Sequence, residues 1–319
     1  MNTAEAESIV SLLLAPWRII MLKKLKRMRA DWLLYLILLP VIANFIIFHY
    51  IPMYGLQIAF KNFNIYLGVT DSPWIGFDNF NRFFSSVFSW QVISNTLIIS
   101  LYCLALSPLP IIFALFLNEV RNIPFKKVIQ TATYLPYFVS SVIMVGLIKI
   151  IFASDGVAND LLVQLGLPSI DFLNAPSAFR SLYVGSQVWK FTGFESIIFI
   201  AAMMGIDPQL YEAAKIDGAG RLRQIFHITI PGIAPTIVIL YIMRMGNILR
   251  IGWQDVLLLQ SPLNSAVSEV IQTFVYKRGL IQADYGFGAA VGMFEAVIGF
   301  IMVVMANRLA KSISDYSLF

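Results

Sequence analysis

The sequence predicts an all-α integral membrane protein with six transmembrane helices. Of its 319 residues, 58% are hydrophobic and 13% are charged, with a mean hydropathy of +0.76, whereas soluble domains carry about 25% charged residues. Six apolar stretches reach roughly 20 residues, the length that crosses a hydrocarbon core. The basic residues behind the net charge of +5 flank these stretches and form no separate patch, so the charge does not indicate a nucleic-acid partner.

The first element is a short apolar run near the N-terminus. Ile9 to Ile20 contains Pro16 and is followed, not preceded, by basic residues, so it is not typical of a signal peptide. We expect an interfacial helix within a cytoplasmic tail, residues 1–31. The remaining residues, 32–319, form the transmembrane domain. Its predicted spans are Trp32–Ile51, Val92–Leu117, Val128–Phe152, Leu182–Met204, Ile228–Leu249 and Gly288–Ala306.

Basic residues are distributed unevenly between the two sides of the predicted spans. The tails and the connections 118–127 and 206–227 hold fourteen Lys and Arg residues, and the opposite connections hold six. By the positive-inside rule, both termini and the 206–227 connection are cytoplasmic. The external connections Pro52–Trp90 and Ala153–Arg180 are too long for simple turns, so we expect ordered caps there. The last external connection, Ile251–Phe287, is expected to be able to contact an external partner.

The sequence contains no pattern that predicts a metal site or a disulfide framework. Cys103 is the single cysteine, and His49 and His227 lie far apart, so neither a disulfide framework nor a metal-ligand spacing is present.

Five charged residues fall within or near the spans, where ionised groups are costly unless paired, hydrated or close to an interface. Two of them are expected to reach an interface, and Glu295 is compatible with either structural pairing or a water-filled path. Lys190 and Glu195 lie five residues apart, which is unfavourable for pairing within one helix, so either is expected to meet a partner on another helix. The five are Lys149, Lys190, Glu195, Arg244 and Glu295.

A substrate route is predicted where polar residues occur in spans that contain glycine. The WK and GNIL strings stand in segments that we expect to be broken at Gly193 and Gly246. The residues predicted to approach the route are Trp189, Lys190, Glu195, Asn247 and Arg250.

The most specific stretch is EAAKIDGAGRLRQIFHITIPGIAP, residues 212–235. Asp207-Pro208 predicts a helix start, with Asp as N-cap and Pro at the first helical position. Asp217-Gly218 then predicts a sharp turn. A second amphipathic segment follows, with Phe226 and Ile230 on one side and arginines in reach of water. Small residues leave the turn with little bulk, so another protein's surface can approach its backbone closely.

This stretch closely resembles the EAA loop of ABC importer membrane subunits, although an ordinary connector is the alternative. Glu212-Ala213-Ala214, Asp217-Gly218-Ala219 and Ile230-Pro231 match its elements in order, with Ile230 where Leu is more common. The resemblance implies that connection 206–227 is a coupling helix that docks on an ATPase subunit. The implied contact residues are Glu212, Ala213, Ala214, Asp217, Gly218, Ala219, Gly220, Arg221 and Phe226.

Further strings along nearly the whole chain resemble one branch of that family. The branch contains oligosaccharide and polysaccharide permeases of binding-protein-dependent ABC importers in the maltose-type superfamily, and the chain is similar to the lipo-oligosaccharide type and to the first membrane subunits of bacterial alginate importers. The implied fold is that of a type I ABC importer permease. The strings lie at Tyr50–Gly55, Ala59–Lys61, Gly76–Phe80, Leu117–Asn122, Tyr134–Pro136, Gly205–Pro208 and Tyr316–Leu318.

The resemblance implies a heteromeric machine in the bacterial inner membrane. Its other members are a second homologous permease, two ATP-binding cassette subunits that hold ATP and Mg, and an extracytoplasmic solute-binding protein that delivers a sugar chain, with an acidic, alginate-like chain as one candidate. This chain has no G-x-x-x-x-G-K-[ST] phosphate loop, so we expect it to be neither an enzyme nor a cofactor-binding subunit. Its surroundings are lipid. The string GFGAAVG at Gly286–Gly292 predicts close helix packing.

Two other classes of protein compete with this interpretation. An ion-coupled secondary transporter also places Lys and Glu within the membrane, but such carriers usually contain inverted repeats and no repeat is visible here. A membrane-embedded enzyme requires a catalytic cluster, and neither H-E-x-x-H nor G-x-S-x-G occurs.

Overall fold

The computed structural model describes residues 31–313, which divide into two units after Gln57. The interfacial helix predicted at Ile9–Ile20 and the string Tyr316–Leu318 lie outside the described residues. The predicted boundary between tail and membrane domain, after residue 31, stays a prediction.

The described part of the first unit is one apolar helical run. Helix α2 (Trp32–Phe45) passes through Pro40, continues through a π-helical turn (Ile46–Tyr50) into α3 (Ile51–Met53), and leads into a 3-10 segment (Tyr54–Phe60). The apolar run reaches Phe60 and thus exceeds the predicted span. No side chain of α2 is buried, which is typical of a helix whose apolar surface faces lipid or another chain.

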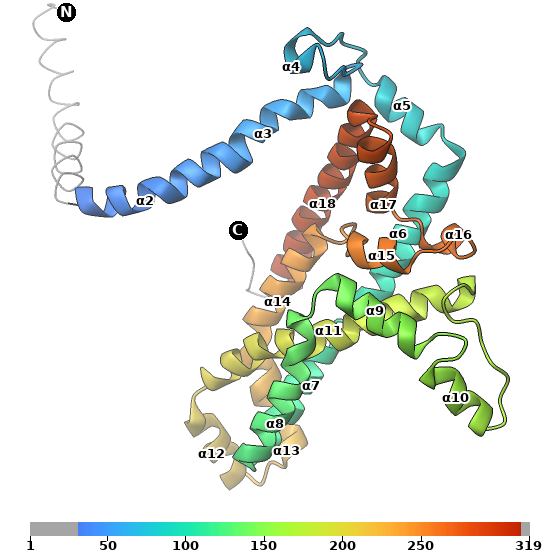
Figure 1. Ribbon diagram of the computed structural model, residues 1–319. Helices are drawn as coiled ribbons and strands as arrows, with labels where there is room; N and C mark the ends of the chain where they lie inside the picture. The colour runs from blue at the N-terminus through green and yellow to red at the C-terminus, as the bar shows by residue number, and fades with distance from the viewer. Residues whose placement is uncertain (1–30, 314–319) are drawn as a thin grey trace, which may run out of the picture. The chain divides into compact units, whose positions relative to one another are not determined.

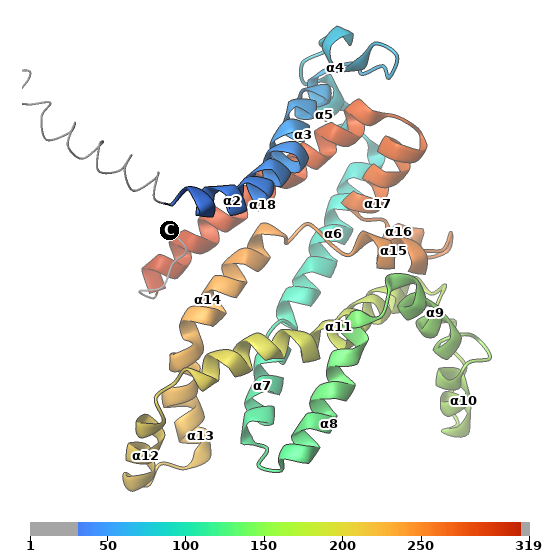
Figure 2. The same ribbon diagram turned by 60° about the vertical axis from the view of Figure 1, so that its left-hand side comes forward.

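The second unit contains the long helices drawn from cyan to red in Figures 1 and 2. Four helical segments of the described chain are long and apolar enough to cross a membrane, and two bent pairs bring the count to the predicted six. The long helices of this unit are α6 (Val87–Ala105), α7 (Leu109–Glu119), α8 (Ile123–Tyr134), α9 (Ser141–Ile151), α11 (Pro176–Met204), α14 (Ile230–Gly246) and α18 (Tyr285–Ile313).

The third predicted span, Val128–Phe152, is wrong as a single helix. Ile123–Phe138 and Ser141–Ile151 meet at an angle of 106°. Pro136, which lacks a backbone N–H, lies in a short 3-10 segment, Leu135–Phe138. The Ser140 side chain then accepts a hydrogen bond from the backbone N–H of Ile143 and caps a new helix.

The long connections are ordered, as predicted for the first two of them. Lys61 is buried and donates to the carbonyls of Val69 and Thr70 at 2.6 and 3.1 Å, which fixes the first connection. Short helices occupy the connections: α4 (Gly68–Asp71), α5 (Asp78–Phe84), α10 (Val157–Gln164), α15 (Trp253–Leu259), α16 (Ser265–Ser268) and α17 (Ile271–Val275), the last followed by a π-helical segment (Tyr276–Ile281).

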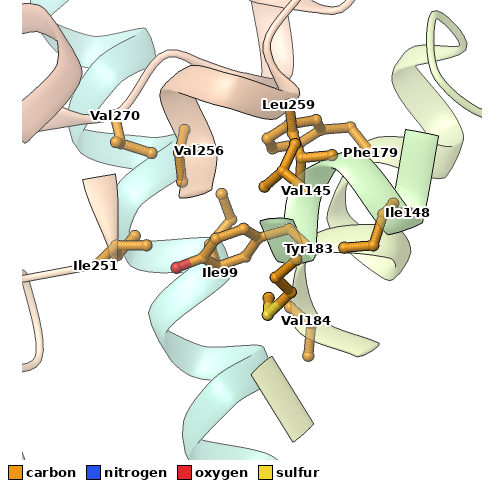
Figure 3. Close-up of a cluster of buried hydrophobic side chains, with 11 residues drawn as sticks. Ile99, Val145, Ile148, Phe179, Tyr183, Val184, Ile251, Val256, Leu259 and Val270 are labelled. Carbon is orange, nitrogen blue, oxygen red and sulfur yellow. The ribbon is translucent and has the colours of Figure 1, made fainter. Parts of the chain in front are cut away.

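Three buried apolar clusters hold the second unit together, and one of them lies where α6, α9, α11 and α15 meet. Figure 3 shows this cluster, with the Tyr183 ring reaching from α11 toward Ile251 and its hydroxyl oxygen at the tip. Tyr183 is 1% exposed. Burial of an aromatic residue by four helices fixes the mutual positions of the elements that carry the polar residues described below.

The predicted packing role of the GFGAAVG string is confirmed at two glycines and wrong at a third. A Cβ built on Gly286 would lie 2.9 Å from the Lys61 carbonyl oxygen, and one on Gly288 would lie 3.0 Å from the Cα of Gly279. A Cβ on Gly292 would meet nothing within 4 Å. Close packing at the start of α18 therefore requires small residues, whereas the position of Gly292 has no such requirement.

A charged cavity and a helical knuckle as candidate functional sites

A cavity of about 450 Å³ lies among α6, α9, α11, α14 and α15. Its wall includes three basic and two acidic side chains together with several hydroxyl and amide groups, an unusual concentration of charge for the interior of an apolar bundle. The charged lining residues are Lys190, Glu195, Arg244, Arg250 and Asp255.

Four of the five residues predicted to approach the substrate route line this one cavity. They are Lys190, Glu195, Asn247 and Arg250. Trp189 is not among the lining residues and is 51% exposed. The structure thus brings four of these side chains together, while their role in transport stays a prediction.

Glu195 on α11 pairs with Arg244 on α14. One guanidinium nitrogen of Arg244 lies 2.7 Å from each carboxylate oxygen of Glu195. Arg244 therefore has a carboxylate partner on the neighbouring helix, and the expectation that it reaches an interface stays a prediction. Both side chains are about one-third exposed, so the pair is open to solvent or to a ligand in the cavity.

Lys190 meets a different partner, Asp255 of α15, at 3.8 Å. Asp255 also accepts a hydrogen bond of 3.0 Å from the Gln187 side chain through Oδ2, whereas its buried Oδ1 has no hydrogen-bond partner among the described residues. Asp255 was not among the predicted site residues, because it lies in a connection with no motif around it. Its position 60 residues beyond Glu195 in the chain gives no signal of their shared cavity.

The two glycines expected to break the spans behave differently. Helix α14 ends at Gly246, as predicted. Helix α11 runs without interruption through Gly193, so the predicted break there is wrong. A Cβ on Gly193 would lie 2.1 Å from the Thr133 carbonyl oxygen of α8. Gly193 therefore permits close contact between two helices and does not interrupt one.

The remaining charges of the predicted spans are divided between surface and interior. Lys149 is exposed. Glu295 of α18 is 8% exposed, and its Oε1 has no hydrogen-bond partner within residues 31–313. Gln272 is a hydrogen-bond partner of the carboxyl group and Arg250 supplies nearby positive charge. Glu295 does not line the cavity, so structural interaction is the better supported of the two alternatives.

A second candidate site is the helix-turn-helix formed by residues 207–229, which we call the knuckle. Helix α12 (Pro208–Ile216) begins at the Asp207 N-cap, whose side chain accepts a hydrogen bond of 2.9 Å from the Gln209 backbone N–H. Gly218 has a φ of +73° and ends the helix, and α13 (Arg221–Gln224) follows. The predicted start and turn are confirmed, and each follows from local backbone chemistry.

The second half of the knuckle is continuous with a membrane-crossing helix. Through a π-helical turn (Ile225–Thr229), α13 joins α14, so one helical run extends from Arg221 to Gly246. On the other side, α12 meets the long helix α11 at 72°. Tyr211 and Thr229 share a hydrogen bond of 2.9 Å between their hydroxyl groups, which ties the two halves together.

The knuckle presents a surface of charged and apolar side chains. In both views α12 and α13 lie at the same end of the second unit as the link between α7 and α8 (Figures 1 and 2), and Arg221 lies 3.7 Å from Glu119 at that link. Glu212 and Arg223 are exposed. The exposed apolar side chains are Leu210, Ile216, Leu222 and Phe226. Such a patch is typical of a surface that another protein covers.

No group of three or more His, Cys, Asp or Glu side chains that could hold a metal ion occurs in the described part of the chain.

Comparison with known proteins identifies the family. Residues 107–315 match the family described as the inner membrane component of binding-protein-dependent transport systems. The chain is 43% identical to the polygalacturonan/rhamnogalacturonan transport system permease protein YteP of Bacillus subtilis (strain 168), over 90% of each chain. The chain therefore belongs to the family of inner-membrane components of binding-protein-dependent transport systems.

Solved structures support the same assignment at the level of the fold. The chain is 42% identical, with a TM-score of 0.84, to a crystal structure of a bacterial ABC transporter involved in the import of the acidic polysaccharide alginate, covering 91% of this chain and 99% of that one. It is 41% identical, with the same TM-score, to a chain of the alginate transporter in complex with an alginate pentasaccharide-bound periplasmic protein, covering 92% and 99%. The fold is that of a type I ABC importer permease, as predicted, and the protein is a membrane component of such a system.

Proposed function

We propose that the chain is the permease subunit of an ATP-driven importer of acidic oligosaccharides or polysaccharides. In this proposal it forms the translocation path with a second homologous permease, receives the sugar chain from an extracytoplasmic solute-binding protein, and is driven by two cytosolic ATP-binding cassette subunits. Those subunits hold ATP and Mg, and this chain supplies the route and the docking surface. The knuckle and both termini face the cytoplasm of a bacterial cell.

The observation that carries the proposal is the connection between the knuckle and the cavity. The two helices that leave the knuckle are α11 and α14, and at the cavity they hold opposite members of one ion pair, Glu195 and Arg244. A displacement of the knuckle therefore reaches both sides of the cavity through helices, with the Tyr211–Thr229 hydrogen bond keeping its halves together. Rigid helices transmit such displacements without a separate relay.

The charge of the cavity supports an acidic sugar. Lys190 and Arg244 each have a carboxylate partner in the cavity wall. Arg250 also lines the cavity, and the carboxyl group near its charge, Glu295, lies outside the wall. The net charge of the wall is therefore positive. A guanidinium group recognises a carboxylate through two parallel hydrogen bonds, which suits the carboxylate of a uronate unit. The relatives compared above import or are named for acidic polysaccharides.

The test is uptake by the reconstituted complex. The chain, its second permease and the ATPase subunits are placed in liposomes with ATP, and uptake of mannuronate, galacturonate and maltose trisaccharides is measured with the binding protein present. The proposal expects ATP-dependent uptake of a uronate trisaccharide. Uptake that persists without ATP and stops with a proton uncoupler would instead support an ion-coupled secondary transporter.

Coupling through the knuckle is tested with two glycines of equal backbone geometry. Gly218 and Gly166 both have a φ of +73°, and a Cβ added at either would meet nothing within 4 Å. Gly218→Val and Gly166→Val therefore impose the same backbone strain, about 1–2 kcal/mol, at the knuckle and after α10. We expect Gly218→Val to lower uptake per ATP hydrolysed by about tenfold, corresponding to a coupling free energy of about 1.4 kcal/mol. Gly166→Val leaves the ratio unchanged.

A charge reversal, Glu212→Lys, tests the same surface without backbone strain, because Glu212 is exposed and forms no ion pair within the described chain. It is expected to reduce the same ratio. Wild-type ratios in both Gly218→Val and Glu212→Lys would contradict coupling through the knuckle.

A further inference from the structure

The Lys190–Asp255 pair is incompletely hydrogen-bonded, although it is buried and faces the cavity. The Lys190 side chain is 11% exposed and that of Asp255 is 5% exposed. Their separation of 3.8 Å exceeds the 2.7–3.2 Å of an N–H···O hydrogen bond. Two buried charges at this distance attract each other and still leave hydrogen-bonding capacity unused.

The unused capacity consists of donors on one residue and an acceptor on the other. Within residues 31–313 the Lys190 ammonium group makes no hydrogen bond, and it lies 5.6 Å from the Phe191 ring. Asp255 Oδ2 accepts one hydrogen bond, from Gln187, and keeps a second lone pair. Lys190 and Asp255 line one cavity from two different elements, α11 and α15.

We propose that Lys190 and Asp255 form a subsite for a ring hydroxyl of the transported sugar. The hydroxyl oxygen accepts a hydrogen bond from the Lys190 ammonium group and donates its proton to the remaining lone pair of Asp255 Oδ2, which lies 3.8 Å from the ammonium nitrogen. A hydroxyl is one of the few groups that can accept and donate through the same atom. This inference rests on the function proposed above and assigns hydroxyl recognition to one pair, separate from carboxylate recognition at Arg250.

The Lys190–Asp255 pair differs from the Glu195–Arg244 pair in its unused hydrogen-bonding capacity. Arg244 contacts both oxygens of Glu195 at 2.7 Å, so that carboxylate already has close donors. A ligand gains little by competing with it. At Lys190–Asp255 a hydroxyl adds two charge-assisted hydrogen bonds and removes none, which makes this pair the more selective of the two for a neutral polar group.

The experiment uses the reconstituted complex and the uronate trisaccharide that it imports, together with analogues that each lack one ring hydroxyl. In the wild-type complex, removal of the recognised hydroxyl lowers uptake efficiency by roughly tenfold or more, because two hydrogen bonds to charged groups are lost. In Asp255→Asn, which keeps an acceptor oxygen but removes its charge, this preference for the hydroxyl falls below the wild-type value. The binding protein is the same in both complexes, so its own selectivity cancels in the comparison.

A double variant guards against loss of folding. Lys190→Met with Asp255→Leu replaces both charges by apolar groups, a change that often preserves or raises stability when made to a buried pair. We expect this variant to assemble and to show no hydroxyl preference. The matched controls Asp160→Asn and Lys149→Gln change an exposed aspartate and an exposed lysine outside the cavity, and both keep the wild-type preference.

The outcomes separate the two proposals. If the wild-type complex imports no uronate trisaccharide, the proposed function fails. If it imports all deoxy analogues equally, or if an assembled variant keeps the wild-type preference, the hydroxyl subsite is overturned and the pair serves only to hold α15 against α11. A water molecule between the two charges supplies the same chemistry, and it predicts this second result because the water does not respond to changes in the sugar.

Discussion

Gly193 determines how closely α11 approaches α8, and adding one methyl group there tests the packing. A Cβ at this position would lie 2.1 Å from the Thr133 carbonyl oxygen and 2.5 Å from its carbonyl carbon. Because ordinary contact begins near 3.4 Å, Gly193→Ala requires the two backbones to separate by more than an ångström. Neither atom belongs to a flexible side chain that can move away.

The cost can be compared with a glycine in the same helix. Gly185 also lies within α11, and a Cβ there meets nothing within 4 Å. Both Gly→Ala changes gain about 1 kcal/mol of helix propensity, but overpacking at Gly193 costs about 1–3 kcal/mol. We therefore expect Gly185→Ala to be neutral or stabilising and Gly193→Ala to be less stable than Gly185→Ala by about 1–3 kcal/mol.

Thermal unfolding of the purified chain in mild detergent measures this difference, and uptake by the complex provides a second measurement. A lower unfolding temperature for Gly193→Ala than for Gly185→Ala is expected, with reduced uptake because Lys190 and Glu195 are on the displaced helix. Equal unfolding temperatures for the two variants would refute the close approach of α8 and α11.

Two further predictions concern the ion pair and the knuckle. A double-mutant cycle of Glu195→Gln and Arg244→Met in the uptake assay should give a coupling energy of about 1 kcal/mol, since both side chains are about one-third exposed and screened. Additive effects of the two substitutions would show that the ion pair contributes nothing to uptake. Asp207→Ala removes the side-chain cap of α12 and should destabilise that helix by about 1 kcal/mol, with lower uptake per ATP hydrolysed. Asp207→Asn keeps a capping oxygen and should retain most of the wild-type ratio. If Asp207→Asn lowers the ratio as much as Asp207→Ala does, the cap is not the cause.

Local chemistry made the knuckle predictable from the sequence. An N-cap aspartate before a proline and a glycine at a positive φ depend on neighbours within a few residues, so the start at Asp207 and the turn at Gly218 follow from the sequence alone. The apolar spans were also predictable in number, because bilayer thickness sets their length.

Features that depend on distant residues were not predictable in this way. A glycine that breaks a helix and a glycine that lets a neighbouring helix approach look the same in the sequence. Only the position of Thr133 on α8 shows that Gly193 is of the second kind. Asp255 becomes part of the cavity because α15 packs against α9 and α11. The 106° bend after Phe138 needed Pro136 and Ser140 together, within a stretch whose average hydropathy suits a continuous span.

The spacing of Lys190 and Glu195 explains why α11 is central to the proposed transport. Five residues correspond to a rotation of about 140° around a helix, too far for the two side chains to pair and enough for them to face different neighbours. Lys190 accordingly meets Asp255 on α15, and Glu195 meets Arg244 on α14. The same helix continues to the knuckle. A rotation or shift of α11 that follows the knuckle must therefore alter both pairs together, whereas a displacement of α14 alone alters only the Glu195–Arg244 pair. Crosslinking of cysteines that replace Lys190 and Asp255 in one variant, and Glu195 and Arg244 in another, measures both separations. Simultaneous loss of both crosslinks in the ATP-bound complex would identify α11 as the moving element.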